Sequence, residues 1–314
     1  MIVAILGVVL PVFLVIGAGY AAARSRIFTP SGVDGLMVFA QRFAIPCVLF
    51  RGISQLDLAA VFDPGLLASF YLGVVAVFVI GMTIARRVLR RRPGEAVAIG
   101  FAAMFSNTVL LGLPIIERAY GPAEMDAMFA IVSIHAPFCY LVGITVMEFS
   151  RADGRGPLAT LTVAGRAIFS NALMIGLALG FVVNLAAIPQ PATLRIAVDM
   201  LADAGLPAAL FGLGGVLSRY AIRASLGTAG TIGLLALVVH PAIVLGLGLF
   251  VFALPEPFLR AAVIAAAMAP GVNAYIFASM YGRAQSEAAS AVLLSTAACV
   301  LTVSAWLALL EAIL

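Results

Sequence analysis

The chain has 314 residues, of which 64% are hydrophobic and only 10% are charged. With a mean hydropathy of +1.17, this composition excludes a soluble globular protein and a nucleic-acid binder, and it indicates an integral membrane protein. The formal net charge is +4, and the longest polar interval, from Phe149 to Arg166, is too short for a soluble domain.

Apolar runs of about 17 to 25 residues are long enough to cross a bilayer as helices. We predict ten such spans, joined by short loops. They lie near residues 1–23, 32–50, 65–85, 95–117, 124–149, 166–187, 193–217, 227–253, 258–281 and 287–311. The first run has no basic residue before it and Arg24 and Arg26 after it, which favours a retained span over a cleaved signal peptide.

The arginines predict the orientation of the spans, because short cytoplasmic loops carry an excess of basic residues. Thirteen arginines lie in the loops after odd-numbered spans and four in the loops after even-numbered spans. We therefore expect the odd-numbered loops, including residues 151–165, to be cytoplasmic. Both termini are expected on the periplasmic or extracellular side of a multi-pass protein of the cell (inner) membrane.

The fourth span contains residues that interrupt a helix. Ser106, Asn107 and Thr108 offer side-chain hydrogen bonds that compete with the helical backbone, and Gly112 and Pro114 follow within two turns. An interrupted helix at membrane depth persists only where it is buried in protein or lines a wet cavity. The sequence therefore predicts a functional break in this span.

The ninth span has a second interruption, at Pro270, Gly271 and Asn273. The same Ala-Ala-Met tripeptide precedes both breaks, at residues 102 and 266. Two interrupted segments at corresponding places in two halves of a chain indicate a transporter whose binding site lies near the middle of the bilayer. Pro114 and Pro270 are interpreted as structural residues that keep the breaks open.

A second sequence match supports an internal duplication. Ile45–Phe50 reads IPCVLF and Leu206–Phe211 reads LPAALF, at an offset of 161 residues, close to the offset of 164 between the Ala-Ala-Met tripeptides. Pro46 and Pro207 are equivalent in this alignment and are also interpreted as helix-breaking structural residues. Five spans per half place the second half in the opposite orientation, so we predict an inverted repeat.

These features resemble the auxin efflux carrier family, which includes plant PIN carriers and bacterial malonate-type carriers. The most specific element is Ser-Asn-x-x-x-x-Gly-x-Pro, from Ser106 to Pro114. The resemblance implies an all-α membrane protein of ten transmembrane helices in a 5+5 inverted repeat, formed by residues 1–150 and 166–314. It also implies scaffold and transport domains, each built from both repeats, and two broken helices that cross as in sodium/proton antiporters and bile-acid symporters.

The crossing predicts an anion site without a formal charge. The half-helices after each break present free N–H groups and the positive end of a helix dipole, and Asn107 and Asn273 add amide donors. Ser106 and Gly271 flank these asparagines and complete the expected substrate contacts. The alternative is that both asparagines only cap the broken backbone.

Charged residues inside spans are functional candidates because their burial is costly. Arg42 lies four residues before Pro46, and Asp203 lies four residues before Pro207. The two side chains either form an ion pair across the repeat axis or extend to opposite interfaces, and Arg42 is also a candidate substrate ligand. Asp203 and Asp199, one turn earlier, are candidates for ion coupling.

Two histidines lie in apolar spans. His135 could bind a carboxylate or carry a proton, or it could be a neutral core histidine. His240 has no polar neighbours along the sequence, which favours a structural role. Gly176 and Gly180 form a small-residue face suited to close helix packing or to a homodimer.

The sequence thus favours a secondary active transporter of small organic anions, such as malonate-like carboxylates, that works by alternating access. The alternative is a cation/proton antiporter or a bile-acid-type sodium symporter on the same fold. An antiporter would need carboxylates near the break, but the only acid in the apolar part of the fifth span is Glu148, at its far end. No enzyme, metal or cofactor motif is present, and a proton or sodium ion is the expected coupling partner.

Overall fold

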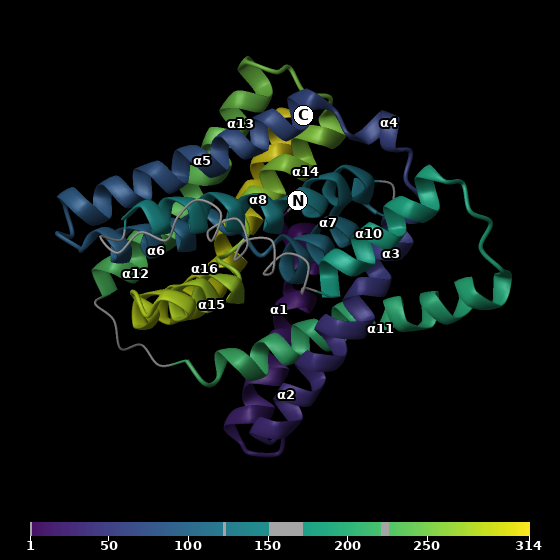
Figure 1. Cartoon of the computed structure of the whole chain (residues 1–314), viewed down its shortest axis with the longest axis horizontal. Coiled ribbons are helices and arrows are strands. Elements are labelled where there is room, and N and C mark those ends of the chain that lie inside the picture. The colour runs from purple at the N-terminus through teal and green to yellow at the C-terminus, as the bar shows by residue number, and fades with distance from the viewer. Residues whose placement is uncertain (1, 122–123, 151–171, 221–225) are drawn as a thin grey trace. The chain divides into compact units, whose positions relative to one another are not determined.

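The computed structural model describes residues 2–121, 124–150, 172–220 and 226–314. Within these ranges the secondary structure is helical, apart from an isolated antiparallel bridge between Ser106 and Pro270. Figure 1 shows the arrangement of the helices. The predicted cytoplasmic loop 151–165 and the start of the sixth predicted span lie outside the described residues.

The helices follow one another closely along the chain. Their bounds are α1 Ile2–Arg24, α2 Pro30–Phe39, α3 Ile45–Gln55, α4 Leu58–Val61, α5 Pro64–Arg87, α6 Pro93–Met104, α7 Leu113–Tyr120, α8 Met125–Ser150, α10 Ala172–Leu185, α11 Ala192–Leu217, α12 Leu226–Leu234, α13 His240–Phe250, α14 Glu256–Ala266, α15 Val272–Tyr281 and α16 Gln285–Ile313. Three short π-helical segments precede three of them: η1 Ala40–Ala44, η2 Thr108–Gly112 and η4 Leu235–Val239.

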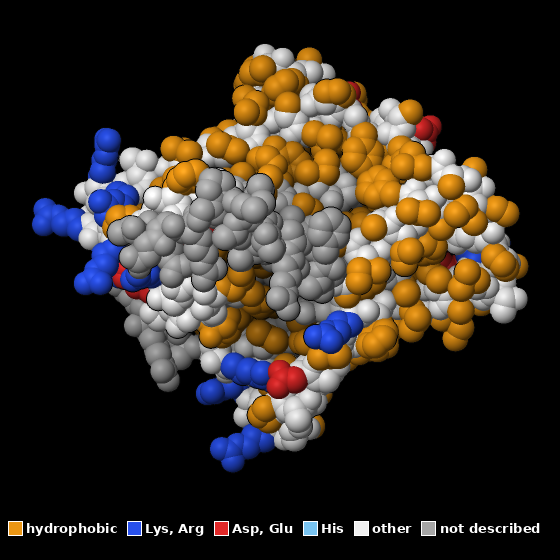
Figure 2. All heavy atoms as spheres, viewed as in Figure 1, with side chains coloured by type: hydrophobic (Ala, Val, Ile, Leu, Met, Phe, Trp, Pro, Cys, Tyr) orange, Lys and Arg blue, Asp and Glu red, His pale blue; other side chains and the backbone are white. Residues whose placement is uncertain are grey.

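The lengths and composition of these helices are those of a membrane protein. In the described part of the chain, seven helical segments are long and apolar enough to cross a bilayer, and α6 and α10 are shorter apolar helices. On α10, Ile175, Leu179 and Val182 are exposed on one face. Hydrophobic side chains also cover much of the surface visible in Figure 2. Apolar side chains that point away from the protein fit a lipid environment rather than water.

Each π-helical segment ends just before a proline in the first turn of the next helix. These prolines are Pro46 in α3, Pro114 in α7 and Pro241 in α13. Proline has no N–H group and its ring clashes with the carbonyl of the preceding turn, so a widened π-turn accommodates it. Pro207 differs, because it lies inside the continuous helix α11. The prediction that Pro207 breaks its helix is therefore wrong.

The chain divides into two compact units. The first unit comprises Met1–Val9, Phe62–Gly165 and Tyr220–Leu314, and the second comprises Leu10–Val61 and Arg166–Arg219. Each unit takes segments from both halves of the sequence.

In the second unit, α3 packs against α10 and α11. A Cβ atom at Gly176 would lie 2.5 Å from the carbonyl oxygen of Pro46, and one at Gly180 would lie 2.9 Å from Cβ of Ile53. The glycines thus permit close contact between α10 and α3. The small-residue face predicted from the sequence serves packing within this unit.

The second unit also contains a close approach of α1 and α11. A Cβ atom at Gly214 would lie 1.9 Å from the carbonyl oxygen of Ile16, and one at Gly19 would lie 1.9 Å from the carbonyl oxygen of Phe211. No side chain fits at these distances, so both positions require glycine.

In the first unit, α5 lies along α6 and also contacts α13 and α14 (Figure 1). The ring of Phe101 in α6 stacks on that of Phe277 in α15, with centroids 3.8 Å apart. An ion pair of 2.9 Å between Arg91 Nη1 and Glu287 Oε1 links the residues before α6 to the first turn of α16. The contacts of α5 thus hold parts of both interrupted helices against a continuous one, and the stacking of Phe101 on Phe277 joins the two interrupted helices to each other.

Candidate functional site

The fourth and ninth predicted spans are both interrupted, at the residues that the sequence indicated. Helix α6 ends at Met104, and the chain resumes helical structure at Thr108. Helix α14 ends at Ala266, and α15 begins at Val272. The predicted positions of both breaks are confirmed.

The two breaks are hydrogen-bonded to each other. The N–H of Asn107 donates to the carbonyl oxygen of Ala269 at 2.9 Å, and the N–H of Gly271 donates to the carbonyl oxygen of Phe105 at 3.0 Å. These bonds form the isolated bridge of Ser106 and Pro270. Each break thus satisfies backbone groups that the other leaves unpaired, which explains how two broken helices are tolerated in an apolar environment.

Asn107 caps the segment that follows the first break. Its Oδ1 accepts from the N–H of Leu110 at 3.2 Å, and its carbonyl oxygen accepts from the N–H groups of Leu111 and Gly112, both at 3.1 Å. Because Oδ1 is engaged in this cap, the amide nitrogen Nδ2 of Asn107 is the group left to donate to a ligand. The side chain is 8% exposed, so that donor lies in a nearly dry environment.

Asn273 lies in the first turn of α15 and is held by α8. The hydroxyl of Tyr140 donates to Oδ1 of Asn273 at 3.2 Å. The Tyr140 ring packs against the rings of Phe101 and Phe105, with centroids 5.6 and 5.7 Å away. The hydroxyl therefore fixes the amide of Asn273 with its Nδ2 group free to donate.

Backbone N–H groups add further donors at the crossing, which is the region where the breaks at residues 105–107 and 267–271 meet. The N–H groups of Val109, Val272 and Asn273 lie in the first turns after the breaks and make no hydrogen bond to any described residue. Unpaired N–H groups at a helix start carry the positive end of the helix dipole. Together with the two asparagine amides, they form a set of donors that carries no formal charge.

Gly112 and Pro114 shape the segment after the first break. A Cβ atom at Gly112 would lie 2.3 Å from Cε of Met128 in α8, so the glycine permits close packing of η2 against that helix. Pro114 occupies the first turn of α7, directly after the π-turn. The close packing at Gly112 and the place of Pro114 at the start of α7 are compatible with structural roles, and the role of Pro114 in keeping the break open stays a prediction.

His135 and His240 are buried beside the crossing. The His135 ring lies 5.1 Å from the Phe105 ring between centroids, and its Nδ1 lies 3.7 Å from Sγ of Cys139. His240 is fully buried, with Nδ1 3.4 Å from Oγ of Ser106. Both imidazoles also pack against Phe70 of α5.

Of the two alternatives for Arg42 and Asp203, the ion pair between them is not formed. Asp203 Oδ1 instead lies 2.8 Å from Nη1 of Arg51, and Asp199 Oδ1 lies 3.5 Å from the same nitrogen. Arg42 is exposed on η1 and makes no ion pair with a described residue. An arginine and two carboxylates one turn apart form an ion-pair cluster that is open to solvent and contributes little to stability.

The structure brings together most of the predicted substrate contacts. Ser106, Asn107, Gly271, Asn273 and His135 lie in the first unit around the two breaks. Arg42, Asp199 and Asp203 belong to the second unit.

Two residues near the crossing were not assigned to it from the sequence. Tyr140 follows His135 by five residues on the same apolar span, and its sequence position alone does not connect it to either break. His240 was interpreted as structural because its sequence neighbours are apolar, yet its polar partner Ser106 is 134 residues away. Only the sequence Val-Val-His-Pro, a polar side chain before a proline within an apolar span, signals an irregular helix there.

Within the described part of the chain, no group of three or more His, Cys, Asp or Glu side chains is arranged to hold a metal ion. The donors at the crossing are amide, hydroxyl and imidazole groups, which suit a hydrogen-bonding ligand.

Comparisons with known proteins relate the whole chain to membrane carriers. The family described as "Membrane transport protein" matches residues 4–307. A protein of Rhizobium meliloti (strain 1021) named "Putative malonate transporter" is 24% identical over 312 residues, covering 98% of this chain and 96% of that protein. "Auxin efflux carrier component 8" of Arabidopsis thaliana is 21% identical over 324 residues, covering 86% of this chain and 88% of that protein. The chain therefore belongs to the membrane transport protein family that includes the auxin efflux carriers.

Proposed function

We propose that this membrane transporter is a secondary active carrier of small organic anions, with malonate-like mono- or dicarboxylates as substrates. The observation that carries the proposal is the crossing, where the breaks of two interrupted helices are hydrogen-bonded to each other and the helical segment after each break begins with unpaired, uncharged N–H donors. A carboxylate that enters such a site loses its water, and only a dense set of donors replaces those hydrogen bonds. The name of the Rhizobium meliloti relative supports the same substrate class.

The proposed architecture has ten spans in a 5+5 inverted repeat. In it, α6 with α7 and α14 with α15 are the fourth and ninth spans, each interrupted by its break. The division of the chain into two units, each drawn from both halves, supports a transport domain and a scaffold domain. We assign the crossing, and hence the first unit, to the transport domain. Alternating access then follows from movement of one domain against the other.

In the proposed site, the Nδ2 groups of Asn107 and Asn273 donate to the substrate carboxylate. The free N–H groups that follow each break add further donors, and Ser106 and Gly271 line the approach. His135 is proposed as an additional uncharged donor. Arg42, which belongs to the second unit, remains a candidate substrate ligand.

A cation/proton antiporter is the second candidate function. It would require an ionisable carboxylate at the crossing. Among the described residues, the side chains that hydrogen-bond at the crossing are Ser106, Asn107, Tyr140, His240 and Asn273, none of which is acidic. Asp199 and Asp203 are engaged with Arg51 instead. These contacts favour an anion as the transported species, with a proton or a sodium ion as the coupling partner.

Further features of the proposal concern the cellular setting. We place the protein in the cell (inner) membrane with both termini on the periplasmic or extracellular side, because the arginine-rich loops then face the cytoplasm. A homodimer would have to use a surface other than the Gly176 and Gly180 face, since α3 occupies that face.

Uptake by the purified protein in proteoliposomes tests the proposal. A panel of radiolabelled mono- and dicarboxylates is offered under separate proton and sodium gradients. Saturable uptake of a carboxylate that one gradient drives supports the proposal. Gradient-driven exchange of sodium for protons, with no carboxylate uptake under any condition, would establish the antiporter instead.

A further inference from the structure

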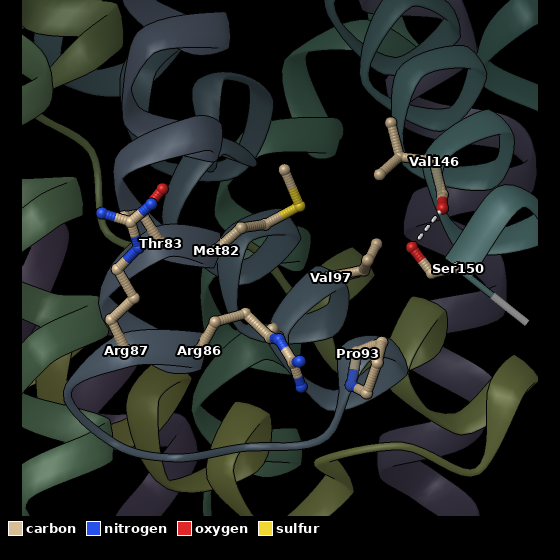
Figure 3. Close-up of a pocket in the computed structure, with 9 residues that line it drawn as sticks. Met82, Thr83, Arg86, Arg87, Pro93, Val97, Val146 and Ser150 are labelled. Atoms are coloured by element: carbon tan, nitrogen blue, oxygen red, sulfur yellow. Dashed lines mark hydrogen bonds between the residues drawn. The ribbon is translucent and has the colours of Figure 1, made fainter.

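A cavity of about 360 Å³ lies in the first unit, where the end of α5, the start of α6 and the end of α8 meet. Figure 3 shows the side chains that line it. They include Met82, Arg86 and Arg87 from α5, Pro93 and Val97 from α6, and Val146 from α8. The crossing shares none of these residues, so the cavity is a separate feature of the molecule.

One side of the cavity is strongly basic. Arg86 donates from Nη1 to the carbonyl oxygen of Arg91 at 2.8 Å, which fixes its guanidinium and leaves other N–H groups available. Arg87 is exposed and makes no ion pair with any described residue. Among the described residues, no acidic side chain lines the cavity. The two guanidinium groups therefore have no described carboxylate as a counter-ion within it.

The surroundings add to this positive charge. The loop after α5 carries Arg90, Arg91 and Arg92, and among the described residues Arg91 forms an ion pair with Glu287. In Figure 2, blue arginine side chains gather at the edge of the surface where α5 meets α6. In the orientation that we propose for this protein, this edge faces the cytoplasmic leaflet, which is the leaflet rich in anionic lipids.

The rest of the cavity is apolar. Met82, Val97 and Val146 form its wall. The hydroxyl of Ser150 donates to the carbonyl oxygen of Val146, four residues earlier in α8 (Figure 3). Thr83 likewise donates to its own helix, at the carbonyl oxygen of Val79. The arginines are thus the polar groups free to recognise a ligand. A small soluble anion would leave the apolar wall uncovered. A phospholipid has an anionic headgroup for the arginines and, next to it, an apolar part that would cover the wall.

We propose that this cavity binds an anionic phospholipid, with the phosphate of its headgroup held by Arg86 and Arg87 and its glycerol and first methylene groups against Met82, Val97 and Val146. Arginine suits this role because its planar guanidinium donates two parallel hydrogen bonds to phosphate oxygens. The lipid would join the ends of α5, α6 and α8 on the face where the first interrupted helix begins.

Native mass spectrometry of the full-length protein tests the proposal, with phosphatidylglycerol and phosphatidylcholine as the two probes. The wild-type protein should retain phosphatidylglycerol with about a tenfold preference over phosphatidylcholine. The double variant Arg86→Gln, Arg87→Gln should lose this preference. Arg90→Gln is the matched control, because it removes one charge from the same loop without touching the cavity, and it should retain the preference.

Two further variants keep the test decisive if Arg86→Gln impairs folding by removing its bond to Arg91. Arg87→Gln alone should reduce the preference severalfold. Val146→Phe fills the cavity while both arginines remain, and it should also reduce lipid retention. Reduced lipid retention in Val146→Phe supports a lipid bound inside the cavity rather than a general attraction of lipid to a basic surface.

Inorganic phosphate and glycerol 3-phosphate distinguish a lipid from a free anion. Under the proposal, neither displaces bound phosphatidylglycerol at millimolar concentration, because neither covers the apolar wall. Three results would overturn the proposal: equal retention in the wild type and the double variant, an equal loss in Arg90→Gln, or binding of the soluble phosphates without binding of the lipid.

Discussion

The hydroxyl of Tyr140 donates a hydrogen bond of 3.2 Å to Oδ1 of Asn273, a residue 133 positions away in the sequence. The bond orients the Asn273 amide without engaging Nδ2. A hydrogen bond of this kind contributes about 0.5 to 1.5 kcal/mol net. We expect Tyr140→Phe to weaken carboxylate binding by about three- to tenfold while the protein folds normally, as measured by calorimetry on the purified variant.

Tyr71→Phe is the matched control for this prediction. The Tyr71 hydroxyl donates to the carbonyl oxygen of Ile131 at 2.7 Å, so its loss also removes a buried hydrogen bond, but one that does not involve an asparagine of the crossing. This variant should lose stability and keep its affinity. Equal affinity of Tyr140→Phe and the wild type would show that the hydroxyl does not position Asn273 for binding.

The interruptions were predictable because their causes are local. Ser106, Asn107, Pro270 and Gly271 disfavour a continuous helix through their own side chains or backbone, and the structure breaks at these positions. The contact between Tyr140 and Asn273 was not predictable, since it depends on how separate helices pack. A single sequence gives no measure of that packing.

The ion pair of Arg42 with Asp203, one of the two alternatives that the sequence left open, is not formed, and the structure gives a physical reason. The pairing of Arg42 with Asp203 rests on their equivalent places, four residues before Pro46 and Pro207. It assumes that the backbone has the same helical geometry before both prolines. Arg42 lies in the π-turn η1, whereas α11 runs as a continuous α-helix through Pro207. Arg51 lies nine residues after Arg42, which places it about 13 Å farther along the chain's helical path. Arg51, after the turn, is the arginine that reaches Asp203.

A second prediction concerns the close approach of α1 and α11. Gly214→Ala would place a methyl group 1.9 Å from the carbonyl oxygen of Ile16, which must separate the two helices. We expect a loss of stability of about 1 to 3 kcal/mol or a failure to obtain monodisperse protein. Thermal unfolding in detergent measures the effect.

Gly230→Ala provides the comparison for this variant. Gly230 lies in α12, and a Cβ atom there would meet nothing within 4 Å. The substitution should be neutral or stabilising by up to ~1 kcal/mol, since alanine favours the helix. A similar loss of stability in both variants would mean that the close contact at Gly214 does not cause the destabilisation of Gly214→Ala.

A third prediction separates an ion-coupling role of Asp203 from a surface role. The Asp203 side chain is 71% exposed and pairs with Arg51. A pair of this kind contributes roughly 0 to 1 kcal/mol. We expect Asp203→Asn to transport carboxylate at a rate within about twofold of the wild type and with the same dependence on the proton or sodium gradient. Uptake that no longer responds to the gradient would instead assign coupling to this carboxylate.

A fourth prediction concerns topology. A single cysteine added at either terminus, in a background where Cys47, Cys139 and Cys299 are replaced by alanine, should react with a membrane-impermeant maleimide applied to intact cells from outside. The reason is the excess of arginines in the loops after odd-numbered spans. A cysteine placed beside Arg90 should react only after the cells are opened. The reverse labelling pattern would invert the proposed orientation.

The central claim, that the donors at the crossing bind the substrate, is tested most directly by carboxylate affinity in Asn107→Ala and Asn273→Ala. Each substitution removes an amide donor whose hydrogen bond to a charged ligand contributes about 1.5 to 3 kcal/mol. We predict that each weakens binding of the best substrate, malonate or another carboxylate of the panel, by about ten- to a hundredfold in protein that remains monodisperse. Near wild-type affinity in both variants would reduce the two asparagines to structural residues of the broken helices and contradict the proposed site.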